Sequence, residues 1–251
     1  MKSKIYEDLA GLYPLWRQTT LQKTDRQKLE TKFVIDVFKK YSVPIHTVVD
    51  LGGGVGLHAS LLLKAGYDVT VFDQSLKALS LAKKQNPKLK TIHGWFEKIN
   101  IRKKYDAAIC LWSTLSYIFT EKGRKNFYSW LDKHIKKLVI LDEANFYSYP
   151  KKFHKVYLGE DARYKMKIIR NWLMAKKDFK KSMSIYEIFD KKLNKTAVVK
   201  DGENQQYVAA QKLQNYFETD WHSQMFGGYS LKKPYNIKSS RIILVFHKKS
   251  L

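Results

Sequence analysis

The chain has 251 residues, of which 44% are hydrophobic and 14% aromatic, enough for a well-buried core in one α/β domain with a small addition. Its single cysteine, Cys110, excludes an internal disulfide and favours a reducing compartment, so we expect a cytoplasmic protein. The longest apolar runs, such as 107–112 and 242–246, are strand-sized, and no apolar segment follows the first lysines. We therefore expect neither a membrane span nor a signal peptide.

The formal net charge is +24, and only seven of the 47 basic residues are arginine. Base reading and bidentate phosphate contacts favour arginine, whereas the lysines here are scattered as pairs such as Lys39-Lys40 and Lys180-Lys181. This composition favours a solvated surface. A nucleic-acid partner is possible but not favoured, and an anionic small molecule would suit the charge.

The first 44 residues are predicted to be helical, because Ile5, Leu9, Leu12 and Trp16 recur at helical spacing. Short apolar strands then alternate with helices. The expected strands of this part are 47–51, 68–72, 90–93, 105–112 and 138–142, and the expected helices are 57–64, 76–84 and 122–136. Alternation at this pitch predicts right-handed crossovers and a parallel, doubly wound α/β sheet.

The rhythm changes after residue 142. Residues 145–208 hold three β-like stretches (164–172, 183–190 and 196–199) without a helix long enough for a crossover, which predicts a small antiparallel insert. A helix at 209–217 and strands at 222–229 and 240–247 are expected to close the sheet. The expected domains are an N-terminal helical cap (1–44), a core (45–144), the insert (145–208) and the closing elements (209–251).

A glycine-rich turn follows the first predicted strand. The strand ends at Asp50, four glycines follow within the next six residues, and a helix begins near Leu57. Glycines there let the backbone adopt positive φ and approach a ligand closely, and the helix N-terminus presents free N–H groups. The segment Gly54–Ala59 also fits the G-x-G-x-x-G/A dinucleotide pattern, with Asp73 placed to bind a ribose.

An NAD-dependent oxidoreductase is therefore an alternative. Two features disfavour it. A carboxylate at Asp50 does not help to hold a pyrophosphate, but its charge attracts an amino group or a sulfonium. A terminal helix followed by two strands also predicts a closing antiparallel hairpin, which ordinary dinucleotide domains lack.

These residues resemble the class I S-adenosylmethionine-dependent methyltransferases, whose first motif is D/E-x-G-x-G-x-G. Asp50, Gly52, Gly54 and Gly56 match it position by position. The resemblance implies S-adenosyl-L-methionine as cofactor and a Rossmann-like, seven-stranded, mostly parallel sheet with an antiparallel last strand. It also implies that the glycine loop packs against the methionine portion and that Asp73 holds the ribose. The cofactor-binding residues expected from it are Asp50, Gly52, Gly53, Gly54, Gly56, Asp73, Gln74, Trp95, Phe96, Leu111 and Trp112.

One departure concerns the adenine site. Many family members follow the third strand with Gly-Asp, whereas here Gly94 is followed by Trp95 and Phe96. Adenine would then be held by backbone groups and aromatic packing, or by Glu97.

The segment Leu111–Tyr117 is similar to the loop of small-molecule N-methyltransferases, such as the amino-sugar N,N-dimethyltransferases and the glycine/sarcosine enzymes. Those families also carry an antiparallel insert after the fifth strand and tyrosines in an N-terminal helix. The catalytic candidates are Tyr117 in this loop, Tyr13 in the N-terminal helix and His222 near the closing strands. Each has an ordinary structural alternative, a half-buried aromatic ring or an exposed histidine. Two further candidates, Glu143 and Asn145, follow the fifth strand, where open α/β sheets bind ligands.

Other chemistries find little support. The sequence has no Cys/His set at metal spacing, so we expect no metal, and it has neither a P-loop nor a G-x-S-x-G elbow. We expect methyl transfer to a small-molecule acceptor, an amine nitrogen before a hydroxyl, because an amine needs no dedicated base. An RNA or protein methyltransferase, a binding module with a vestigial pocket, and a homodimer all stay open.

Overall fold

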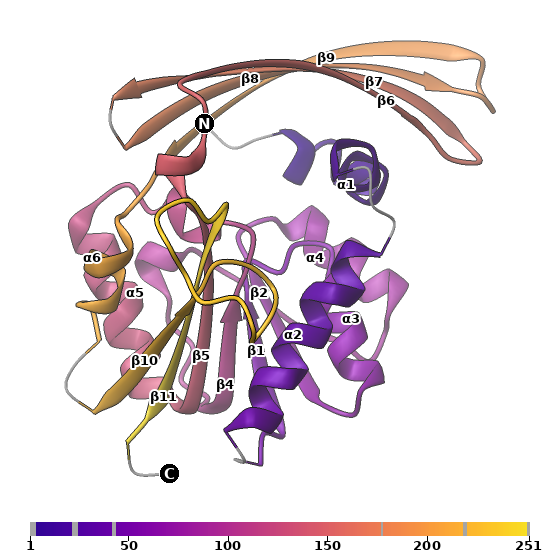
Figure 1. Ribbon diagram of the computed structural model, residues 1–251. Coiled ribbons are helices and arrows are strands. Elements are labelled where there is room, and N and C mark those ends of the chain that lie inside the picture. Colours follow the sequence, from indigo (N-terminus) through magenta and orange to yellow (C-terminus); the bar gives the residue numbers. More distant parts are fainter. Residues whose placement is uncertain (1–3, 22–24, 42–43, 177, 218–219, 250–251) are drawn as a thin grey trace. The chain divides into compact units, whose positions relative to one another are not determined.

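The computed structural model describes residues 4–21, 25–41, 44–176, 178–217 and 220–249. The chain divides into two compact units (Figure 1). The smaller unit comprises Met1–Arg26 and Pro150–Gln205, and the larger unit comprises Gln27–Tyr149 and Gln206–Leu251. No helix among the described residues is long and apolar enough to cross a bilayer.

The larger unit is built on a seven-stranded sheet with the order β10-β11-β5-β4-β1-β2-β3. Its strands are β1 (Thr47–Leu51), β2 (Asp68–Asp73), β3 (Lys90–His93), β4 (Tyr105–Cys110), β5 (Ile135–Ala144), β10 (Trp221–Phe226) and β11 (Arg241–Lys248). The pairs among β1 to β5 are parallel, whereas β11 runs antiparallel to both of its neighbours. The predicted Rossmann-like sheet with an antiparallel last strand is confirmed.

Helices cover both faces of this sheet (Figure 1). One face packs against α2 (Arg26–Lys40), α3 (Leu57–Lys64) and α4 (Leu76–Gln85), and the other against α5 (Glu121–His134) and α6 (Ala210–Gln214). Along β1, Val48 packs on the α2 side, while Val49 and Leu51 pack on the α5 side. Because side chains alternate along a strand, Asp50 is directed to the α2 side.

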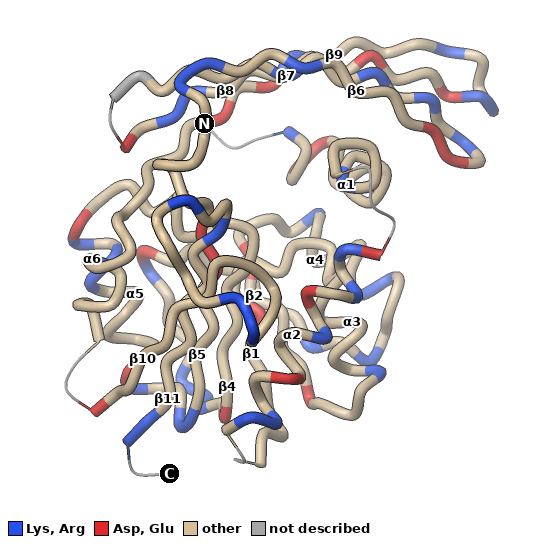
Figure 2. The backbone as a smooth tube through the Cα atoms, in the orientation of Figure 1, with Lys and Arg blue, Asp and Glu red and all other residues tan. Residues whose placement is uncertain are grey.

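Side-chain caps begin two helices directly after strand-end loops. Ser75 accepts the N–H of Ala78 at the start of α4, and Thr120 accepts the N–H of Gly123 at the start of α5. At the opposite ends, α2, α3, α4 and α5 each carry lysine in the last turn. Lysine there offsets the negative end of the helix dipole, and basic positions recur along both units (Figure 2).

The smaller unit is a four-stranded antiparallel sheet in the order β6-β7-β8-β9. Its strands are β6 (Lys152–Glu160), β7 (Tyr164–Lys176), β8 (Phe179–Asp190) and β9 (Lys195–Gln206). The short helices η1 (Lys4–Tyr6) and η2 (Ala10–Leu12) and the helix α1 (Tyr13–Leu21) pack on it through the cluster that contains Trp16, Ile168 and Tyr186. The N–H groups of Lys4 and Ile5 donate to the Asp201 carboxylate.

Several predicted boundaries need correction. The antiparallel insert has one more strand than predicted, because β6 is exposed at most positions and shows little apolar alternation. The first residues form short 3-10 turns before α1 instead of one continuous helix. The fourth strand ends at Cys110 and not at Trp112, because Trp112 and Ser113 leave the extended conformation.

Candidate active site

The glycine turn after β1 requires glycine at three positions. Gly52, Gly54 and Gly56 have φ values of +74°, +53° and +74°, which other residues rarely adopt. A Cβ added to Gly52 would also collide with the side chain of Thr114, and one added to Gly53 would lie 2.6 Å from Asp50 Cγ. The turn therefore leaves a cradle of bare backbone at the carboxyl end of β1.

Asp73 lies against this cradle. At the end of β2, its Oδ2 accepts the N–H of Gly54 at 2.9 Å and its Oδ1 accepts the N–H of Ser75 at 2.8 Å. These two bonds join the ends of β1 and β2 and fix the direction of the carboxylate. A carboxylate oxygen has two lone pairs, so one that accepts an N–H can also accept a hydroxyl.

Asp50 is buried beside the same glycines. Its side chain is 2% exposed, and Oδ2 has no hydrogen-bond partner among the described residues. Burial raises the pKa of Asp50 to about 6, and Asp73 adds to the rise, whereas His58 opposes it. An orphaned carboxylate oxygen beside a bare backbone cradle fits the positively charged amino end of a ligand such as S-adenosylmethionine.

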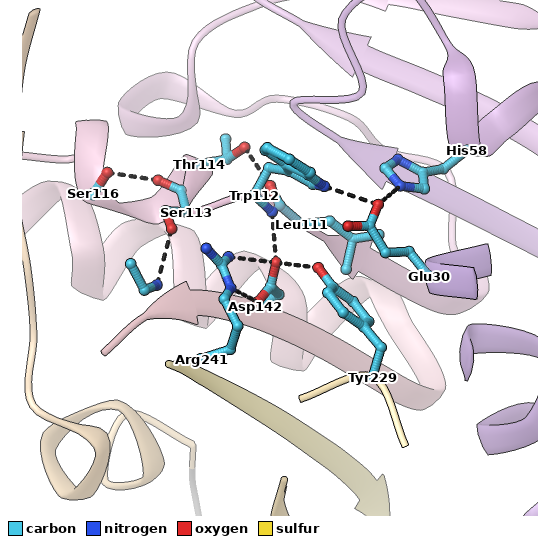
Figure 3. Close-up of polar contacts among 11 residues, drawn as sticks. Glu30, His58, Leu111, Trp112, Ser113, Thr114, Ser116, Asp142, Tyr229 and Arg241 are labelled. Carbon is cyan, nitrogen blue, oxygen red and sulfur yellow. Dashed lines mark hydrogen bonds and ion pairs between the residues drawn. The ribbon is translucent and has the colours of Figure 1, made fainter. Parts of the chain in front are cut away.

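The loop after β4 faces this cradle and is held in an uncommon conformation. Trp112 and Ser113 have φ values of +65° and +60°. The N–H of Trp112 donates to Asp142 Oδ2 at 2.8 Å, and the N–H of Ser113 donates to the Asp142 carbonyl at 2.9 Å. Ser113 Oγ in turn accepts the N–H of Ala144 at 2.9 Å (Figure 3). The end of β5 therefore dictates the shape of this loop.

Asp142 is the centre of a polar network that the sequence did not reveal. It is fully buried, and Arg241 donates to its two oxygens at 2.8 and 2.6 Å (Figure 3). The Tyr229 hydroxyl also donates to Oδ2, at 2.5 Å. Two features of the sequence could have indicated this network. Asp142 ends a predicted apolar strand, and Arg241, one of only seven arginines, lies at the start of another.

The residues expected around the adenine are placed unequally. Trp95 is 43% exposed after β3, whereas Phe96, in η3 (Phe96–Lys98), is buried and packs against the Phe72 and Phe127 rings. Leu111 is buried among core side chains on the α2 face. Phe96 and Leu111 thus have a packing role in this structure.

Gln74 directly follows Asp73 and is half-buried. Its carbonyl lies 3.0 Å from His93 Nε2. Cofactor contacts for Gln74 and for the other expected residues stay predictions.

The three catalytic candidates lie on three different elements. Tyr117 ends η4 (Thr114–Tyr117), half-buried in the loop after β4. Tyr13 belongs to the smaller unit, where its ring stacks on Trp16 with centroids 5.5 Å apart. His222 needs correction: it is exposed on β10 opposite His247, at the amino edge of the parallel strands. Because β11 runs antiparallel to β5, that edge is opposite the glycine cradle, and the structure does not support catalysis by His222.

Glu143 is buried at the end of β5 on the face that packs against α5. It is 2% exposed, and the backbone N–H groups of Leu115 and Ser116 in the loop after β4 lie near its carboxylate. Burial and the nearby Asp142 raise the pKa of Glu143 to about 8, although Arg241 opposes the rise. Glu143 therefore carries a proton at neutral pH.

Asn145 has a structural position after β5. Its Nδ2 donates to the carbonyls of Ile237 and Ser239 at 2.8 and 2.7 Å, which fixes the segment that leads into β11. Among the described residues no group of three or more His, Cys, Asp or Glu side chains could hold a metal ion.

We expect Gly52→Ala to destabilise the protein more than Gly66→Ala. Both glycines have positive φ, but a Cβ at Gly66 meets nothing within 4 Å, whereas one at Gly52 meets Thr114. The free energy of unfolding should fall by about 1 kcal/mol for Gly66→Ala and by at least about 2 kcal/mol for Gly52→Ala. Urea titration measures both, and equal losses would contradict the tight cradle.

Glu143→Gln should stabilise the protein increasingly as pH rises. The pKa of Glu143 is higher in the folded than in the unfolded state, so its contribution to stability declines as pH rises from the unfolded value to about 8. We expect the unfolding temperature of Glu143→Gln to exceed that of the wild type by roughly 5 °C or more at pH 8.5 and by less at pH 5. A pH-independent difference would contradict a protonated Glu143. Glu187→Gln, which changes a partly exposed ion pair, is the control.

Comparison with known proteins agrees with this geometry. Residues 48–137 match the family model described as a methyltransferase domain. The glycine/sarcosine N-methyltransferase of Aphanothece halophytica is 32% identical over 131 residues, which are 48% of this chain and 48% of that relative. The chain spans about half the length of the curated relatives it matches.

Two solved structures share the fold at low sequence identity. An S-adenosylmethionine-dependent methyltransferase from Clostridium acetobutylicum has a TM-score of 0.79 at 16% identity, covering 96% of this chain and 98% of that one. A sugar N-methyltransferase from Streptoalloteichus has a TM-score of 0.75 at 12% identity, covering 91% and 92%. The family match therefore covers residues 48–137 of the larger unit, and the two solved structures share the fold of the chain.

Proposed function

We propose that this protein transfers a methyl group from S-adenosylmethionine to an amine nitrogen of a small molecule. The observation that carries the proposal is the pair of carboxylates on either side of the glycine cradle. The N–H of Gly54 fixes Asp73. Beside the same glycines, Oδ2 of Asp50 has no hydrogen-bond partner among the described residues. Two anionic groups beside bare backbone suit a ligand with a ribose and a cationic amino end, and they do not suit a pyrophosphate.

The cofactor would be held by groups that the fold already fixes. Asp73 would accept the ribose hydroxyls, Asp50 would pair with the amino group, and the turn at Gly52–Gly54 would allow close approach of the methionine portion. When bound, the cofactor supplies a methyl group that its sulfonium has already activated. The protein then has to align the acceptor and exclude water, so positioning accounts for much of the rate.

The acceptor side is proposed to be the loop after β4. Tyr117 is the candidate there, because its half-buried ring lies at the end of η4 in the loop that β5 holds in place. The names of similar proteins, glycine/sarcosine and sugar N-methyltransferases, favour an amine acceptor over a hydroxyl. An amine needs only to lose its proton to be nucleophilic, so such an acceptor does not require a dedicated base. Roles for Tyr13 and for the insert at 145–208 on the acceptor side stay predictions.

We expect Asp73→Asn to weaken binding of S-adenosylhomocysteine by roughly 100-fold or more. The substitution removes the charge from two hydrogen bonds to ribose and disturbs the bond to the Gly54 N–H, each worth about 1.5–3 kcal/mol. Isothermal titration calorimetry measures the affinity. Asp68→Asn, at the exposed start of the same strand, should bind like the wild type. An affinity of Asp73→Asn within a few-fold of the wild-type affinity, or no binding by the wild type, would reject the proposal.

The affinity for S-adenosylhomocysteine should fall as pH drops below about 6. The pKa of Asp50 is about 6, so its carboxylate is charged above that pH and loses its attraction for the ligand's ammonium below it. We expect up to roughly tenfold loss per pH unit in the wild type. Asp50→Asn should bind roughly 10- to 100-fold more weakly at pH 7.5 and show no such step. A step that persists in Asp50→Asn would assign it to another group.

A further inference from the structure

Glu30 is a buried carboxylate on a helix that sequence patterns assign to packing. It lies in α2, between neighbours such as Phe33, Val34 and Val37 that fill the core, and its side chain is 0% exposed. A carboxylate in such a place is destabilising unless other groups neutralise or hydrogen-bond it. The contacts of Glu30 therefore point to a role beyond packing.

One oxygen of Glu30 joins three elements. Its Oε2 lies 2.8 Å from Nε2 of His58 in the first turn of α3, and it accepts the indole N–H of Trp112 at 3.0 Å (Figure 3). His58 directly follows the glycine turn, and Trp112 is in the loop after β4. Glu30 thus contacts both the helix that follows the glycine turn and the loop after β4.

The Trp112 contact completes the restraint on an unusual backbone. Asp142 fixes the main chain of Trp112 and Ser113 through two N–H groups, but it does not touch the indole nitrogen. The bond from the indole N–H to Glu30 restrains the direction of that ring. The loop that carries Trp112 follows β4, which pairs with β1, the strand that carries Asp50.

The His58 contact acts on Asp50. The electrostatic interaction with His58 lowers the pKa of Asp50, whereas burial, the larger effect, and the charge of Asp73 raise it. Two further titratable groups are nearby. Cys110 on β4 interacts electrostatically with Asp50, and Tyr229, which is hydrogen-bonded to Asp142, interacts electrostatically with Glu30. His58 and the backbone N–H of Ala59 both favour an ionised Asp50, and Glu30 is the carboxylate that holds the His58 ring.

We propose that Glu30 is a positioning residue of the cofactor site, which fixes the Trp112 ring and keeps His58 directed toward Asp50. This inference rests on the proposed function. It assigns to Glu30 two separable effects, one on the indole of Trp112 and one on the ionisation of Asp50. A residue that only fills the core would produce neither of them selectively.

The first measurement follows the indole directly. Protein labelled with ¹⁵N-tryptophan has six tryptophans, and Trp112→Phe identifies the Trp112 indole signal by its loss. We expect Glu30→Gln to move that signal and to leave the other five in place. Asp36→Asn is the matched control, because Asp36 is a carboxylate of the same helix that pairs with Lys32 at the surface.

The second measurement follows binding of S-adenosylhomocysteine as a function of pH. With His58 no longer held, the pKa of Asp50 should rise, so the pH midpoint of binding should move up by about one unit in Glu30→Gln. Affinity would then be about threefold weaker at pH 6.5 and unchanged at pH 8. His58→Gln should shift the midpoint without moving the Trp112 signal, whereas Trp112→Phe should leave the midpoint in place.

An unchanged indole signal and an unchanged midpoint in folded Glu30→Gln would overturn the inference. If Glu30→Gln does not fold, the His58→Gln and Trp112→Phe variants decide, and a midpoint unmoved by His58→Gln would overturn it. Wild-type protein that fails to bind S-adenosylhomocysteine at any pH would instead overturn the proposed function. The two failures are therefore distinguishable.

Discussion

A carboxylate that leaves water must find a cation, hydrogen-bond donors or a proton, and this requirement governs the carboxyl edge of the larger sheet. Asp142 is met by the guanidinium of Arg241, which binds both of its oxygens. Glu30 is met by an imidazole and an indole. Glu143, the residue after Asp142, keeps its proton instead, as its pKa of about 8 indicates. These three acids are thereby committed to structure, and none of them is available to a cationic ligand.

The two remaining acids are left available by the same physics. Asp73 accepts two backbone N–H groups, which stabilise its charge, and each carboxylate oxygen can accept more than one hydrogen bond. Asp50 has an oxygen with no partner among the described residues, and its burial makes the charge costly until a cation arrives. A ligand with an ammonium group would offset that free-energy cost, and a neutral ligand would not. The buried charge of Asp50 would therefore favour a cationic ligand. The bare glycine backbone beside them removes the steric obstacle to its approach.

Local patterns predicted the cradle but not what supports it. The glycines and Asp50 are adjacent in sequence, and the strand that ends at Asp73 is short and apolar, so spacing was enough. Glu30 and Trp112 are 82 residues apart, and Asp142 and Arg241 are 99 apart, so no window could pair them. The prediction for His222 failed for a related reason. The pattern of a closing hairpin does not tell at which edge of the sheet the first residues of β10 lie, because that depends on how β10 and β11 pair with the rest of the sheet.

The loop after β4 shows why such distant support is needed. Two successive residues other than glycine in left-handed conformations cost of order 1–3 kcal/mol each, and a free loop would relax. Here the end of β5 binds both N–H groups, and Ser113 Oγ binds back to Ala144, so relaxation would break three hydrogen bonds. A reaction that depends on alignment benefits from a wall that cannot shift, since small displacements of an acceptor slow an in-line transfer strongly. Rigidity at Trp112 is therefore better explained by the requirements of the site than by those of the fold, because the sheet itself could have ended with an ordinary turn.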